Sequence, residues 1–152
     1  MPARKLLRLP GFDYSRPRLY FVTICAGRRG PVFGSVVIGD DGAPAVVLNA
    51  LGRQVTAAVV ALPGHGGAVV VALLVMPDHL HLVVCLAEEG PSLGVVIGGL
   101  KAGVARRTRT AGLWQRGYHD RVVRDERELE NICAYIDTNP SRWVAARGVG
   151  GR

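Results

Sequence analysis

Two apolar segments separated by only two residues constrain this chain more than any other feature. Residues 68–76 (AVVVALLVM) and 79–86 (HLHLVVCL) are rich in β-branched and aliphatic side chains, and only Pro77 and Asp78 lie between them. Runs of this kind are typical of strands, and hairpin spacing between two strands implies antiparallel pairing. The sequence therefore predicts an antiparallel pair of strands here.

The segments around this hairpin predict one further strand, a small hairpin and two helices. Residues 18–26 are aromatic and β-branched and follow Pro17, which predicts a first strand. Two short apolar runs between Val36 and Val47 flank GDDGAP and indicate a surface hairpin inserted before the first helix. Residues 48–62 and 92–109 carry apolar residues at helical spacing and predict the first two helices.

The C-terminal part predicts one more strand and one more helix. Residues 118–124 resemble a strand, and residues 125–139 a helix that Asp125 caps and Pro140 ends. The tail 147–152 is expected to be loose. The order strand, helix, strand, strand, helix, strand is the ferredoxin-like order. We therefore expect an α+β protein with a ferredoxin-like (βαββαβ) antiparallel sheet, an added C-terminal helix and a single domain over residues 1–152.

The charge of the chain points to an anionic partner. Nineteen Lys and Arg against twelve Asp and Glu give a formal net charge of +7 over 152 residues. Such an excess attracts polyanions and makes phosphate contacts a source of affinity. A basic surface without a nucleic-acid partner remains the alternative at this point.

Cysteine usage and hydropathy indicate the compartment. Cys25, Cys85 and Cys133 lie within apolar runs and lack zinc-ligand spacing, so we expect reduced core residues. The N-terminus has charges but no apolar core of a signal peptide. The longest apolar run is much shorter than the roughly 20 residues that span a bilayer. We therefore expect a cytoplasmic protein with no membrane contact.

Two of the four histidines lie one residue apart in the second strand of the hairpin. Because side chains alternate along a strand, His79 and His81 project from one face while Leu80 and Leu82 point to the other. Two imidazoles on one face can chelate a metal ion, but two ligands leave the metal unspecified. The alternative is a pair of strand histidines that hydrogen-bond to their neighbours.

The third helix offers candidates to complete a metal site. Tyr135 lies on the flank of its apolar stripe, and Asn139 follows four residues later on the same flank. If the first two helices cover one sheet face, this helix covers the histidine face and brings both residues there. Two imidazoles, an amide oxygen and a phenol suit phosphodiester chemistry with Mg²⁺ or Mn²⁺. Simple packing of Tyr135 with its hydroxyl in water is the alternative.

Two basic clusters are candidates for DNA contact. One follows the second helix and the other follows the first strand: Lys101, Arg106, Arg107, Arg109, Arg28 and Arg29. Both clusters could track a DNA backbone by releasing its counterions. A solvated helix end with favourable dipole placement is an equal alternative for the helical cluster.

The segment MPDHLHLVV resembles the M-P-N-H-x-H-L signature of the single-tyrosine HUH transposases, in particular the REP-associated tyrosine transposases. The opening segment RLPGFDYSRPRLYFVTICAGRRGPVFG and the closing segment LWQRGYHDRVVRDERELENICAYIDTNPSRW are similar to those of the same family. Nearly the whole chain is covered by this resemblance.

The resemblance implies metal-dependent cleavage and rejoining of single-stranded DNA near hairpin (REP-like) elements. It implies His79 and His81 as paired metal ligands, Asn139 as the third metal-binding position and Tyr135 as the nucleophile. The tyrosine would form a 5′-phosphotyrosine and release a 3′-hydroxyl. A homodimer is one of the states considered, and the sequence does not decide between a monomer and a dimer.

Two departures from the family pattern stand out. Arg121 replaces a histidine that is common in relatives, and its role is left open, while His119 lies two positions earlier. LKAG stands where relatives often have F-K-S, although Lys101 is retained.

Two other functions compete with the transposase interpretation. One is a non-catalytic domesticated DNA- or RNA-binding module on the same fold, but RNA-binding sheets usually display aromatics on central strands, and histidines stand here instead. The other is a metal-dependent phosphoesterase that uses water and does not need Tyr135.

Overall fold

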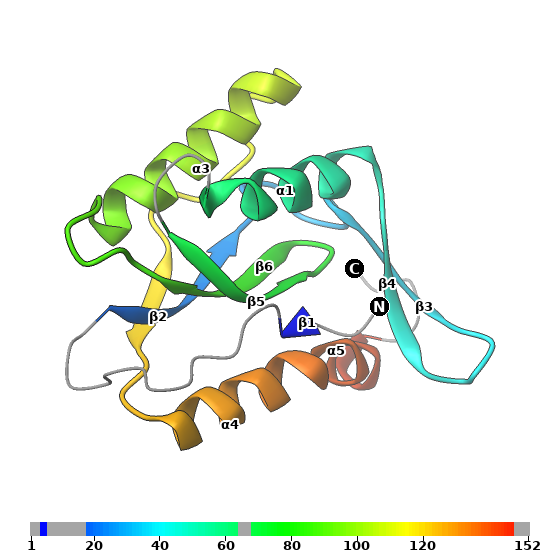
Figure 1. The fold of residues 1–152 in the computed structure, drawn as a ribbon. Helices are drawn as coiled ribbons and strands as arrows, with labels where there is room; N and C mark the ends of the chain where they lie inside the picture. Colours follow the sequence, from blue (N-terminus) through cyan, green and yellow to red (C-terminus); the bar gives the residue numbers. More distant parts are fainter. Residues whose placement is uncertain (1–3, 6–17, 64–67, 148–152) are drawn as a thin grey trace.

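The computed structural model describes residues 4–5, 18–63 and 68–147 (Figure 1). Its strands are β1 (Arg4–Lys5), β2 (Leu19–Cys25), β3 (Gly34–Ile38), β4 (Pro44–Leu48), β5 (Val69–Val75), β6 (His79–Cys85) and β7 (His119–Val122). Its helices are α1 (Ala50–Val60), α3 (Leu93–Thr108), α4 (Glu126–Asp137) and α5 (Asn139–Arg147).

Five of the strands form one antiparallel sheet in the order β1-β5-β6-β2-β7, and β3 and β4 form a separate hairpin. The predicted hairpin of β5 and β6 is confirmed, and β6 lies in the middle of the sheet. The register between β2 and β6 places Thr23 opposite His81 and Cys25 opposite His79. Residues that are directly opposite share a sheet face.

Helices cover both faces of this sheet, with α1 and α3 above it and α4 and α5 below it in Figure 1. One core lies under α1 and α3 and includes Leu80, Leu82 and Val84 of β6. The other lies between the sheet and helices α4 and α5 and includes Val83 and Cys85 of the same strand. Because both faces of β6 are buried, its sequence is nearly continuous in apolar residues. His79 and His81 are the polar exceptions.

Side-chain caps set where the helices begin. Asn49, Ser92 and Asp125 each accept a hydrogen bond from a backbone N–H in the first turn of α1, α3 and α4, respectively. The predicted Asp125 cap is thus confirmed. α3 ends at Thr108, and its C-cap residue Arg109 adopts the left-handed conformation that closes many helices.

The structure confirms the mixed fold of helices and an antiparallel sheet, with the predicted order of the main elements. The narrower ferredoxin-like classification stays a prediction. Strand β1 was not expected from the sequence. The expected loose tail begins at Arg147, which closes α5, and its remaining residues 148–152 lie outside the described residues. Within the described part of the chain, no helix is long and apolar enough to cross a membrane.

The single C-terminal helix that we expected is instead two helices. α4 ends at Asp137, as the nearby proline suggested, but Pro140 is the second residue of α5 rather than the start of a loop. A proline disrupts the turn before it, yet it fits the first turn of a new helix because no N–H is needed there. The chain therefore breaks and restarts at Asn139.

Two glycines, one in α1 and one in α3, provide a test of how these helices pack in the structure. A methyl group on Gly52 of α1 would overlap the Phe33 carbonyl oxygen and press on Leu48, whereas one on Gly98 of α3 would meet nothing within 4 Å. We expect Gly52→Ala to lower the free energy of unfolding by about 1–3 kcal/mol. The matched Gly98→Ala should raise it by roughly 0.5–1 kcal/mol, because alanine is the better helix former. Urea unfolding measures both, and equal effects of the two changes would contradict the packing.

Candidate active site

The centre of the candidate site is the pair of histidines on β6. His79 and His81 project from the sheet face that α4 and α5 cover, where their rings meet Tyr135, Asn139 and Trp143, and their Nε2 atoms lie 3.1 Å apart. The two rings meet edge to face, with centroids 4.7 Å apart. The expected sharing of one strand face is thus found in the structure, and both Nε2 atoms approach the same point.

Each of these imidazoles has a partner at its other nitrogen. His79 Nδ1 lies 2.7 Å from Asp78 Oδ1, and His81 Nδ1 lies 2.9 Å from Thr23 Oγ1. The hydrogen bond from His79 lowers the pKa of the Asp78 carboxyl, although partial burial acts in the opposite direction. Neither Asp78 nor Thr23 was identified from the sequence. Asp78 could have been suspected from its place beside His79, but Thr23 needs the β2–β6 register.

His81 is buried and uncharged. Its side chain is only 5% exposed, and burial lowers its pKa to about 3, with the charges of His79 and Arg142 acting in the same direction. A neutral imidazole keeps a lone pair that can bind a metal ion. The site therefore offers this nitrogen without having to remove a proton near neutral pH.

Asn139 reaches the same point from the start of α5. It is buried, and its amide nitrogen lies 3.3 Å from His81 Nε2. The two ends of an amide are interchangeable by rotation, so the same position can present an oxygen. Asn139 lies beside the histidines, as we expected. It does so as the first residue of α5, however, and not as a continuation of α4.

Tyr135 lies at the open edge of the site, on α4. Its side chain is 45% exposed, and its ring packs edge-on against His81, with centroids 5.8 Å apart, and against Phe21 at 6.2 Å. Arg142 of α5 stacks its guanidinium 3.9 Å from the centre of the tyrosine ring and also donates to the Tyr135 carbonyl oxygen. Arg142 was missed by sequence reasoning because its role depends on the turn between the two helices.

The donor set can hold a divalent cation. Two adjacent ligands at 2.1 Å from an octahedral ion are about 3.0 Å apart, which is close to the observed distance between the two Nε2 atoms. The third donor would be the Asn139 oxygen, and water or substrate oxygens would fill the remaining positions. Among the described residues, no three His, Cys, Asp or Glu side chains gather around one point. An ion here would therefore depend on the amide.

The predicted DNA-contact residues occupy different environments. Arg106, Arg107 and Arg109 are exposed at the end of α3, and Arg28 and Arg29 are exposed after β2. The chain just before Arg28 lies beside the chain that follows Arg109, since Gly27 N donates to the Leu113 carbonyl oxygen. Lys101 is different because its ammonium donates to the carbonyl oxygens of Gln115 and Gly117. It holds the loop before β7 in place.

Arg121, where the family resemblance led us to expect a histidine, forms an ion pair with Glu128 at 3.3 Å. Glu128 also accepts a hydrogen bond from the Arg124 backbone N–H, and its own N–H donates to Asp125. The pair therefore joins β7 to the first turn of α4. His119 and Arg121 lie opposite Thr23 and Phe21, so both share the face of the histidine pair.

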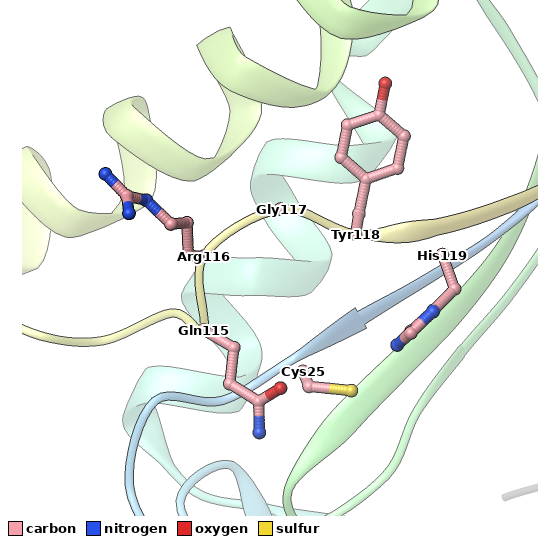
Figure 2. Close-up of a pocket in the computed structure, with 6 residues that line it drawn as sticks. All are labelled: Cys25, Gln115, Arg116, Gly117, Tyr118 and His119. Carbon is pink, nitrogen blue, oxygen red and sulfur yellow. The ribbon is translucent and has the colours of Figure 1, made fainter.

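A small pocket of about 130 Å³ lies beside Cys25, at the end of β2 (Figure 2). The loop before β7 forms the rest of its wall. Figure 2 shows the Cys25 thiol between the side chains of Gln115 and His119, with Arg116 and Tyr118 directed away. Because Cys25 stands opposite His79 in the sheet, the pocket is next to the candidate site.

The fold and the site together define an α+β protein in which strand histidines, a helix amide and a tyrosine meet on one face of an antiparallel sheet. No family model matches the chain. In sequence, it is 25% identical over 166 residues to a Haemophilus influenzae protein of uncharacterized function, covering 92% of this chain and 89% of that protein. It is also 31% identical over 84 residues to a candidate REP-associated tyrosine transposase from Haemophilus influenzae, covering 46% of this chain and 48% of the relative.

Two solved structures share the fold. One is a REP-associated tyrosine transposase bound to a REP hairpin, with a TM-score of 0.67, 16% identity and coverage of 90% of this chain and 74% of that chain. The other is a candidate transposase from Deinococcus radiodurans, with a TM-score of 0.52, 20% identity and coverage of 88% and 97%. The resemblance to REP-associated tyrosine transposases that the sequence indicated is thereby confirmed.

The burial of His81 predicts how stability depends on pH. Its pKa is about 3 in the folded protein against 6.5 for an ordinary histidine, so between these values the unfolded chain binds more protons. Its contribution to stability is therefore complete above pH 6.5 and is lost as the pH falls toward 3.

We expect metal-free protein to lose less stability between about pH 7.5 and 5.5 when His81 is replaced by Asn than the wild type does. Urea unfolding at the two pH values measures this difference. The matched change of the exposed His119 to Asn should leave the wild-type loss in place. If His81→Asn and wild type lose the same free energy of unfolding, His81 does not titrate as a buried neutral group.

Proposed function

We propose that this protein is a metal-dependent single-stranded DNA endonuclease and strand transferase, an HUH-type transposase that acts at hairpin-containing DNA. The observation that carries the proposal is the approach of His79 Nε2, His81 Nε2 and the Asn139 amide to one point beside Tyr135. The likeness in fold and sequence to REP-associated tyrosine transposases supports it, since one of these is bound to a REP hairpin.

In this proposal, His79, His81 and Asn139 hold Mg²⁺ or Mn²⁺. When bound, such an ion would polarise a phosphate and stabilise the charge that develops on it. Imidazole and amide donors without thiolate suit these ions, and the imidazoles favour Mn²⁺. The low pKa of His81 suits the same role, because protons do not compete for its lone pair at neutral pH.

Tyr135 would supply the nucleophile. Its oxygen loses the phenol proton and forms a bond to phosphorus while the bond from phosphorus to the 3′ oxygen breaks, and that oxygen takes up a proton and leaves as a 3′-hydroxyl, so no net proton is gained or lost. The step exchanges one phosphodiester linkage for another, which is the 5′-phosphotyrosine. Rejoining therefore needs no external energy source. The half-exposed ring allows a strand to approach, and the Arg142 guanidinium over it is available to a nearby phosphate.

Tyr135→Phe tests the chemistry directly. Phenylalanine keeps the ring that packs on His81 and Phe21, so loss of the exposed hydroxyl should cost about 1 kcal/mol of stability or less. We expect cleavage to fall to background while hairpin binding is preserved. The measurement uses 5′- and 3′-labelled single-stranded hairpin DNA with Mn²⁺, followed by denaturing gels for the covalent adduct and native gels for binding.

Wild type should carry the downstream fragment as a covalent adduct and release the upstream fragment with a 3′-hydroxyl, and EDTA should stop both. Tyr20→Phe is the matched control, because Tyr20 packs on the other face of the sheet, toward α1 and α3. Continued cutting by Tyr135→Phe would favour the water-using phosphoesterase. Hairpin binding by wild type without any cutting would favour the non-catalytic module.

The arginines at the end of α3 provide a test of DNA binding. We expect the double change Arg106→Gln and Arg107→Gln to flatten the slope of log affinity against log salt by about 1.4–1.8, because each phosphate contact contributes about 0.7–0.9. Arg53→Gln with Arg127→Gln removes the same charge from elsewhere on the surface and should change the slope less. Lys101 is left intact because it anchors a loop. Equal slopes for the two double variants would mean that Arg106 and Arg107 are only solvated surface charges.

A further inference from the structure

The Nδ1 atoms of the two histidines are both occupied, and by different kinds of group. Asp78 Oδ1 lies 2.7 Å from the Nδ1 of His79, and Thr23 Oγ1 lies 2.9 Å from that of His81. On the opposite side of the rings, the two Nε2 atoms are 3.1 Å apart. Each imidazole is therefore held from behind while its other nitrogen points to the shared point.

The carboxylate of Asp78 defines which nitrogen of His79 carries the hydrogen. An ionised carboxylate can only accept, so a hydrogen bond with it requires Nδ1–H, and in the neutral ring this leaves the lone pair on Nε2. The Thr23 hydroxyl can accept in the same way from Nδ1–H of His81. If both rings take this form, two lone pairs face one another across 3.1 Å, an arrangement that a cation between them would relieve.

Neither side chain is needed to build the local backbone. The turn between β5 and β6 is held by backbone bonds: Ala26 N–H donates to the Asp78 carbonyl oxygen, Val32 and Phe33 donate to that of Pro77, and Met76 donates to that of His79. Thr23 lies in the middle of β2, which is paired on both sides by β6 and β7. These bonds of the turn and the strand pairing do not involve the Asp78 carboxylate or the Thr23 hydroxyl, and each of the two groups contacts a histidine.

We propose that Asp78 and Thr23 are positioning residues, which hold His79 and His81 with Nδ1 protonated and both Nε2 atoms directed at one divalent cation. The part that concerns the cation rests on the proposed function. The part that concerns the hydrogen on His79 stands without it, because it follows from the carboxylate alone. In metal sites, partners of this kind orient the ring and raise its basicity as a ligand.

The experiment compares Mn²⁺ affinity across two pairs of variants by calorimetry on the full chain. Asp78→Ala and Thr23→Val remove the partner groups, and each should weaken Mn²⁺ binding by about 10–100-fold. Asp78→Asn keeps an acceptor oxygen and Thr23→Ser keeps the hydroxyl, so both should bind nearly as wild type does. Asp120→Ala is the control, because Asp120 is exposed and lies opposite Val22, whose side chain faces the other core.

A second readout needs neither metal nor activity. In metal-free protein at about pH 8, above the ordinary histidine range, the ¹⁵N spectrum of the imidazoles should show the Nδ1–H form for His79. Asp78→Ala should shift this ring toward a mixture with the Nε2–H form, and Asp78→Asn should retain Nδ1–H. These spectra also report whether each variant is folded.

The outcomes separate this inference from the proposed function. If Asp78→Ala and Thr23→Val bind Mn²⁺ as tightly as wild type while wild type still cleaves DNA, the positioning roles are overturned and the function stands. If wild type does not bind Mn²⁺, the metal-dependent function fails together with the cation part of the inference. The His79 spectrum then decides the role of Asp78 by itself, and an Nε2–H form in wild type would overturn it.

Discussion

The pairing of β6 with β2 on one side and β5 on the other is the interaction on which the site depends. It sends Leu80 and Leu82 into the core under α1 and α3, and it sends His79 and His81 toward α4 and α5. A slip of one residue would exchange the faces and bury two imidazoles in an apolar core. The register of β6 between its two neighbours therefore fixes the direction in which the histidines project.

The break between α4 and α5 is the second constraint. Thr138 closes α4, and Asn139 begins α5 with its side chain buried beside His81. Arg142, one turn into α5, donates to Thr138 Oγ1 and to the Tyr135 carbonyl oxygen, so it holds the two helices in a fixed relation. The break lets one short segment present a buried amide and a half-exposed phenol to the same point, because the two residues no longer share one helix axis.

At the candidate site, uncharged side chains lie at the centre and charged side chains lie around them. His81 is kept uncharged by burial, and the Asp78 carboxylate lies behind His79, away from the shared point. Arginines lie farther out, over the Tyr135 and Trp143 rings and at the end of α3. In the function that we propose, neutral donors bind the cation while the outer positive charge attracts the DNA backbone.

The sequence by itself determined the strands other than β1, the main helices and the common face of His79 and His81, because these follow from periodicities of two and 3.6 residues along the chain. It also brought Tyr135 and Asn139 into consideration, through their helical spacing and through the family resemblance. Only the tertiary structure decided that Asn139 belongs to a second helix, that Lys101 anchors a loop and that Thr23 stands behind His81. Those facts depend on strand register and helix docking, which join residues that are 58 positions apart, as Thr23 and His81 are, and no local pattern records such a contact.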